Sequence, residues 1–102
     1  MDRHLSNLRL MLDQIPLEAA DWDEINGFAH TFDGYTESGS FERCAEIAHQ
    51  RRHDTLTELR TCLFFEARAW RHGGGEPGDN DMVYLRGLIR QIRQKVINGH
   101  LA

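Results

Sequence analysis

Apolar residues recur along the chain at the spacing of α-helices that each have one apolar face. Five stretches repeat an apolar residue every three or four positions, and none alternates apolar and polar residues as a half-buried strand would. The expected helices cover residues 2–15, 21–32, 41–53, 55–72 and 79–98. Because short connections place consecutive helices side by side, the sequence predicts an all-α fold. We expect a small antiparallel helical bundle of about five helices, four main ones and a shorter N-terminal or connecting one, in a single domain of residues 1–102.

Residues with capping roles stand where these helices are expected to begin and end. Asp21 precedes Glu24 by three residues, the spacing of a capping box, and Thr55 with Glu58 repeats it. Ser40 is the expected cap of the third helix, after a polar turn at residues 36–40. The other signals are Asp79 or Asp81 as the last cap, and Pro16, Gly34, the glycines at 73–75, Asn98 and Gly99 as helix ends.

The apolar faces also predict the core. Its expected residues include Phe41, Cys44, Ala45 and Ala48 in the third helix, and Leu85, Leu88, Ile89, Ile92 and Val96 in the fifth, which has the most regular stripe. The last two helices have about 17 residues each, or roughly 25 Å. We therefore expect them to form a central hairpin, with the shorter helices packed around it.

The fourth helix is unusual because it is apolar on two sides. With about 100° per residue, Leu59 and Leu63 mark one apolar face, whereas Phe64 and Phe65 fall toward the opposite one. Such a helix is either central in its own domain or exposes one side to a partner. Two interpretations stay open: the first three helices cover the phenylalanines, or Phe64 and Phe65, with Tyr84 nearby, form a surface for self-association or for another protein.

Glu66 lies within the main apolar face of the same helix, between Leu63 and Trp70. A charged carboxylate in apolar surroundings costs several kcal/mol unless it is paired. We expect an ion pair with an arginine of a facing helix, such as Arg43 or Arg9. The alternative is that Glu66 contacts a ligand or a metal ion.

Composition and charge narrow the class of protein. No apolar run exceeds the four residues at 62–65, which excludes a membrane span, and residues 1–16 lack the continuous apolar segment of a secretory signal. The net charge of −4 does not favour non-specific binding of nucleic acid. Residues 1–40 hold eight acidic and two basic residues, and residues 41–102 hold eight acidic and ten basic ones. We expect these two parts to pair within the fold rather than head to tail between two copies.

The two cysteines, Cys44 and Cys62, belong to no CxxC or CxxH pair. We expect both to be small buried residues in a reducing compartment, which favours the cytoplasm. The chain also lacks a G-x-S-x-G elbow and a Ser-His-Asp order. The sequence therefore contains no recognisable catalytic motif.

Two polar groups suggest alternative chemistry. Glu46 and His49 have the Glu-x-x-His spacing of di-iron bundles, with His53 one turn further along, but no second copy of the motif exists and the stripe points away from the apolar face. A basic flank beside the last apolar stripe could contact phosphates or the acidic second helix, although no helix-turn-helix pattern accompanies it. This flank consists of Arg86, Arg90 and Arg93.

We therefore expect a non-catalytic cytoplasmic module for protein–protein interaction or self-association, which forms a homodimer or binds another protein and needs no cofactor. The first alternative is a helical bundle that binds a metal or a small ligand, through Glu66 or through Glu46, His49 and His53. The second is a weak nucleic-acid contact through the three arginines of the basic flank.

Overall fold

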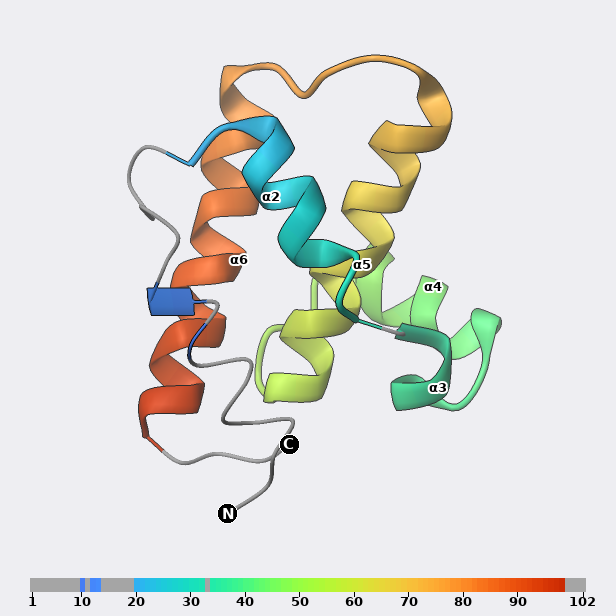
Figure 1. Cartoon of the computed structure of the whole chain (residues 1–102). Helices are drawn as coiled ribbons and strands as arrows, with labels where there is room; N and C mark the ends of the chain where they lie inside the picture. The colour runs from blue at the N-terminus through green and yellow to red at the C-terminus, as the bar shows by residue number, and fades with distance from the viewer. Residues whose placement is uncertain (1–9, 11, 14–19, 33, 99–102) are drawn as a thin grey trace.

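The computed structural model describes residues 10, 12–13, 20–32 and 34–98, and within these ranges it contains helices and no strand. In chain order the helices are α2 (Trp22–Ala29), α3 (Gly34–Ser38), α4 (Phe41–His49), α5 (Leu56–Gly73) and α6 (Asp79–Ile97) (Figure 1). The all-α prediction is confirmed. The helix expected over residues 2–15 lies mostly outside the described residues.

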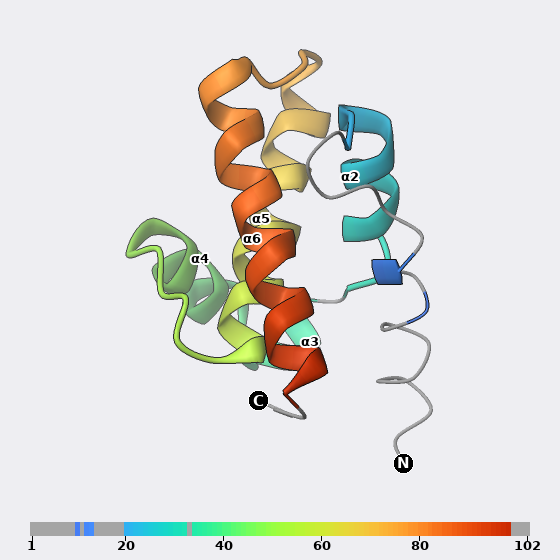
Figure 2. The same cartoon turned by 90° about the vertical axis from the view of Figure 1, so that its left-hand side faces the viewer.

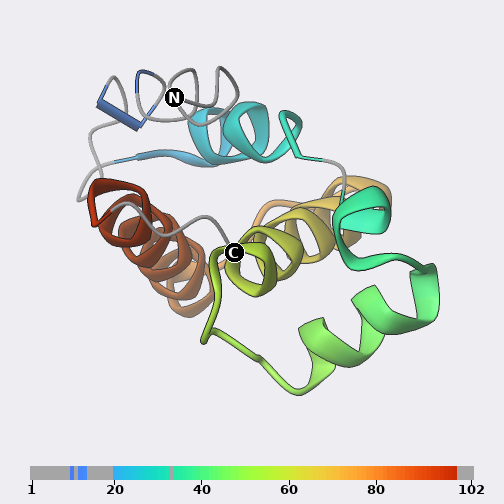
Figure 3. The ribbon, with the colours of Figure 1, turned by 90° about the horizontal axis from the view of Figure 1, so that it is seen from below.

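Helix α5 occupies the middle of the fold. It packs antiparallel to α6, and α2 lies against both of them, while α3 and α4 pack on α5 from another side. Figures 2 and 3 show α2 and α4 on opposite sides of the α5–α6 pair. The predicted central hairpin is therefore confirmed. The position of α5 also explains its two apolar sides, because one faces α2 and α6 and the other faces α3 and α4.

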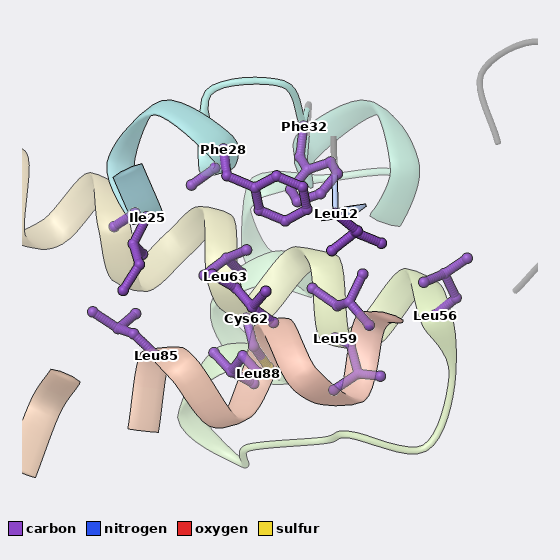
Figure 4. Packing of buried hydrophobic residues seen from close by; sticks show 14 of the residues in the cluster. Leu12, Ile25, Phe28, Phe32, Leu56, Leu59, Cys62, Leu63, Leu85 and Leu88 are labelled. Atoms are coloured by element: carbon purple, nitrogen blue, oxygen red, sulfur yellow. The ribbon is translucent and has the colours of Figure 1, made fainter. Parts of the chain in front are cut away.

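The main core fills the space between α2, α5 and α6 (Figure 4). Ile25 and Phe28 of α2 meet Leu63 of α5 and Leu85 of α6, and all four are buried. The whole predicted stripe of α6 is buried as well, at Leu85, Leu88, Ile89, Ile92 and Val96. The prediction for α4 is wrong in part, because Ile47 joins Cys44 in the interior whereas Phe41 is 56% exposed.

The predicted capping boxes both form. The Asp21 side chain accepts a hydrogen bond from the Glu24 backbone N–H at 2.8 Å, and Thr55 accepts one from the Glu58 N–H at 3.1 Å. Ser40 caps α4 by accepting from the Arg43 N–H at 3.1 Å. These caps fix the starts of α2, α4 and α5 at the expected positions.

Four boundaries differ from the sequence-based expectation. Helix α2 ends at Ala29 rather than at residue 32, and Gly34, an expected helix end, is the first residue of α3. The expected polar turn at residues 36–40 is largely the short helix α3. The cap of α6 is Gly78, with no side-chain hydrogen bond, so Asp79 and Asp81 lie inside the first turn, where their negative charge is favourable. Helix α4 ends at His49 rather than at residue 53.

The early end of α4 has a clear backbone cause. Arg51 adopts a left-handed conformation with φ 49°, which an α-helix cannot contain. The Arg51 N–H donates to the Ala48 carbonyl at 3.2 Å, and the Arg52 N–H donates to the Ile47 carbonyl at 3.1 Å. This pair of bonds is a Schellman motif, which normally uses glycine at the left-handed position. The pattern of side chains therefore does not predict that the left-handed position falls at Arg51.

Candidate interaction surface

Phe64 is half-buried, and one side of its ring packs on α3. Its ring contacts the backbone of Gly34 so closely that a Cβ on Gly34 would lie 2.7 Å from Cδ1 of the ring. The ring also packs edge-to-face with Tyr35, with 5.4 Å between the ring centroids. Helix α3 therefore covers part of Phe64, and this half-buried residue is a contact between α3 and α5.

Phe65 takes a different position, at the border of the surface. Its ring centroid lies 5.6 Å from that of Phe41 and 6.4 Å from that of Tyr35. Phe41 and Phe65 line a hollow of about 320 Å³ together with Arg68, Ala69 and His72. We call these five lining residues the aromatic face. It combines apolar side chains with the polar side chains of Arg68 and His72, and the Arg68 guanidinium lies 5.2 Å from the centroid of the Tyr35 ring.

A second hollow lies on the C-terminal part of α5. Its volume is about 370 Å³, and Glu66, Ala69, Trp70, Gly73 and Gly75 line it. We call it the Glu66 hollow. Ala69 lines both hollows, so they adjoin one another on α5. The sequence indicates Phe65 as a surface candidate and Glu66 as a polar candidate. It does not indicate Phe41, Ala69 or Trp70 as residues that line a surface hollow.

Tyr84 belongs to another cluster. Its hydroxyl lies 3.1 Å from Nε2 of His53, and the Arg51 guanidinium lies 4.3 Å from its ring centroid. The Cys62 thiol also belongs to this cluster, because it and the Tyr84 hydroxyl influence each other's pKa. Because Cys62 and Phe64 are two residues apart on a helix, they point in nearly opposite directions. The structure therefore separates Tyr84 from the two phenylalanines with which the sequence analysis grouped it.

Burial governs the titration of the Tyr84 cluster. It raises the pKa of Cys62 to about 11 and that of Tyr84 to about 12, and nearby negative groups act in the same direction. It lowers the pKa of His53, with the Arg51 charge as the next cause. A catalytic cysteine needs a lowered pKa and access to solvent, and Cys62 has neither. The expectation that both cysteines are free and buried is confirmed.

The buried charged residue of α5 is Arg60, not Glu66. Arg60 forms an ion pair with Glu37 of α3, with side chains 8% and 21% exposed, and its guanidinium lies 4.7 Å from the ring centroid of Phe32. Glu66 is half-buried, and Arg43, its proposed partner, instead pairs with Glu46 at 3.1 Å. The other proposed partner, Arg9, lies outside the described residues.

Thr61 adds a second polar contact between α5 and α3. It is fully buried, and its hydroxyl lies 2.6 Å from that of Ser38. In the sequence, Arg60 and Thr61 stand between Leu59 and Cys62. This position among core residues is the sequence feature that indicates two buried polar contacts, because this part of α5 is buried on every side.

The structure does not assemble the predicted metal ligands. Because α4 ends at His49, His53 lies in the following connection and does not continue the helical stripe. Glu46 is paired with Arg43 at 3.1 Å and with Arg52 at 3.3 Å, and His53 contacts Tyr84. Among the described residues, no group of three or more His, Cys, Asp and Glu side chains could hold a metal ion. The prediction that Glu46, His49 and His53 share one helix face is wrong.

Two arginines of the basic flank make contacts within the chain. Arg86 donates through Nε to the Ala20 carbonyl at 2.9 Å, and Arg93 pairs with Asp13 at 3.9 Å. Arg90 is exposed. Together with the Arg60–Glu37 pair, these contacts join the basic later part of the chain to the acidic first part, as expected. Arg86 is thus held against the residue that precedes α2 through its Nε.

None of the helices in the described part of the chain is both long enough and apolar enough to cross a membrane. In comparisons with known proteins, no protein family, no curated protein and no solved structure matches this chain. The aromatic face and the Glu66 hollow are therefore the features from which a function can be inferred.

Proposed function

We propose that the chain is a non-catalytic self-association module, which forms a homodimer through the aromatic face. The observation that supports this proposal most directly is the exposure of Phe41, which is 56% exposed beside a hollow of about 320 Å³. Large aromatic residues of this kind supply much of the binding energy in protein interfaces.

The shape of the aromatic face suits a two-fold interface. In such an interface both copies use the same patch, so the patch must be complementary to itself. A projecting ring at Phe41 and an adjoining hollow on α5 meet this condition, because the ring of each copy can enter the hollow of the other. Burying one phenylalanine side chain contributes about 1.5–3 kcal/mol, and the symmetry doubles this contribution.

The polar residues around the patch fit the same arrangement. Arg68 and His72 stand at the edge of the apolar centre, as polar residues do at the rim of protein interfaces. A cytoplasmic location belongs to the proposal too, and the two free, buried cysteines are consistent with it.

Sedimentation of the full chain tests the proposal. We expect the wild type to sediment as a dimer and Phe41→Asp to sediment as a folded monomer, because Phe41 is exposed and its replacement leaves the core intact. Val83→Asp is the matched control, since Val83 is 66% exposed on α6 and lies outside the aromatic face. This control should stay dimeric.

Two results would overturn homodimerisation through this face. One is a wild type that remains monomeric at roughly 0.1 mM chain, a concentration well above the dissociation constant of a stable dimer. The other is a Phe41→Asp variant that remains dimeric. A monomeric wild type that binds a different protein, with loss of binding in Phe41→Asp alone, would assign the aromatic face to that protein instead.

A further inference from the structure

The Glu66 hollow combines a carboxylate with an indole ring at the C-terminal end of α5. Glu66 and Trp70 are one helical turn apart, so their side chains are neighbours on the helix surface, and both are half-buried. The volume of about 370 Å³ falls in the range of small-ligand sites. The hollow can therefore hold more than a single small ion.

Among the described residues that line this hollow, Glu66 is the only ionisable one. Arg68 lies over the Tyr35 ring, and Nη1 of Arg71 contacts the His30 ring at 2.7 Å, so both flanking arginines of α5 are engaged elsewhere. Within the described part of the chain, the Glu66 carboxylate has no ion-pair partner. No described residue of the chain therefore neutralises the charge of the Glu66 carboxylate through an ion pair.

The backbone adds to this negative potential. The last carbonyl groups of a helix lack partners from the following turn and carry a partial negative charge of about half a unit. Helix α5 ends at Gly73, with Gly74 in the left-handed conformation at φ 74°. A Cβ on Gly73 or Gly75 would meet no described atom within 4 Å, so the space directly beside these two glycines is open.

We infer that the Glu66 hollow binds an organic ammonium group of the lysine type. The charged nitrogen pairs with the Glu66 carboxylate, and the ring of Trp70 attracts the cation and covers its alkyl chain. An anion is repelled by Glu66 and by the helix end. A neutral apolar ligand would remove water from the carboxylate without replacing the hydrogen bonds that the water makes. A calcium ion needs six or more oxygen ligands, and the lining offers one carboxylate.

Such an ammonium group has two possible sources, a lysine side chain of a protein or a free alkylamine. Proton–nitrogen NMR of the two tryptophan indoles tests the site and separates the sources. The probes are n-butylammonium chloride and a blocked pentapeptide with one lysine between alanines, and n-butanol is the uncharged control. We expect both cations to shift the Trp70 signal with roughly millimolar affinity, while n-butanol does not. Trp22, which packs on the core from α2, serves as the internal reference.

The two cationic probes then identify the source. Peptide binding at least tenfold tighter than that of n-butylammonium assigns the hollow to a protein lysine, and equal binding assigns it to a free amine. The site does not depend on self-association, because Phe41 takes no part in its lining. The same titration is therefore repeated with Phe41→Asp, and we expect the affinities to be unchanged.

Variants of Glu66 decide between this site and general attraction to an acidic protein. Glu66→Gln keeps the shape of the side chain and should weaken cation binding at least tenfold. Glu76→Gln removes the same charge from the exposed connection that follows α5, outside the lining, and should bind as the wild type does. Trp70→Leu should weaken binding too, and thermal unfolding shows which variants remain folded. Absence of any Trp70 shift at roughly 50 mM probe, or undiminished binding by Glu66→Gln, overturns the inference.

Discussion

The ring of Phe64 rests directly on the backbone of Gly34, which joins α3 to the side of α5 that faces away from α2. A Cβ on Gly34 would lie 2.7 Å from Cδ1 and 3.2 Å from Cγ of that ring. Only a residue without a side chain permits this approach. The glycine therefore lets a short helix cover a phenylalanine that would otherwise be exposed.

Gly34→Ala should lower the free energy of unfolding by about 1–3 kcal/mol, because the added methyl group forces the Phe64 ring to move and the Tyr35 ring holds it in place. Urea unfolding measures the change. Gly27→Ala is the control, since a Cβ at Gly27 of α2 meets no atom within 4 Å. This control should be neutral or stabilising by up to about 1 kcal/mol. Equal losses in both variants would contradict a close contact at Gly34.

The ion pair between Arg60 and Glu37 should be far more sensitive than the exposed pair between Arg43 and Glu46. Arg60→Leu leaves the Glu37 carboxylate without this partner in a position 21% exposed, and we expect a loss of roughly 3 kcal/mol. Arg43→Leu should cost less than about 1 kcal/mol, because both side chains of that pair are more than 40% exposed. Adding Glu37→Leu to Arg60→Leu should restore part of the stability in urea unfolding. Comparable losses in the two single variants would show that the buried pair has no special role.

Arg51 offers a separate measure of backbone strain. Arg51→Ala and Arg51→Gly both remove the guanidinium that lies 4.3 Å from the Tyr84 ring centroid, but only glycine relieves the cost of φ 49°. We therefore expect Arg51→Gly to be more stable than Arg51→Ala by about 1 kcal/mol. Thermal and urea unfolding report the difference. Two variants of identical stability would mean that the end of α4 rearranges when the arginine is lost.

The Cys62 thiol should make stability fall at alkaline pH. Its pKa is raised from 9.0 to about 11 in the folded state, so its contribution is complete below pH 9 and is lost as the pH rises from about 9 to 11. Unfolding curves across this range should show the decline, and Cys62→Ala should show a smaller one. Thiol-reactive reagents should leave Cys62 unmodified in the native protein at neutral pH and modify it in urea. Rapid native modification would contradict the buried position.

The helices and their starts were largely predictable because their determinants are local. Asp21 with Glu24 and Thr55 with Glu58 each form the capping box that their spacing indicates. The stripe of α6, from Leu85 to Val96, is buried throughout because apolar residues recur at helical spacing over about three turns. These features depend on neighbours within a few positions, which a sequence displays directly.

The surfaces were less predictable because they depend on contacts between distant segments. Phe64 and Phe65 are adjacent and chemically equal, but only Phe64 meets Gly34, thirty positions earlier. The turn at Arg51 moved His53 off the helix and removed the predicted metal site. Helical spacing places Glu66 among apolar residues and the glycines at 73–75 predict the helix end, but neither shows that a hollow lies beside Glu66.

The order of the helices also sets the order in which this chain can fold as it is synthesised. Helix α2 is made early, but the two helices that cover its Ile25 and Phe28 come from the last half of the sequence. In a nascent chain in which α6 is not yet available to pack, Ile25 and Phe28 are therefore exposed to solvent, although both are buried in the folded chain. Apolar surface exposed in this way is what chaperones recognise and what causes aggregation. Synthesis that has not yet completed α6 therefore leaves the core between α2 and α5 incomplete.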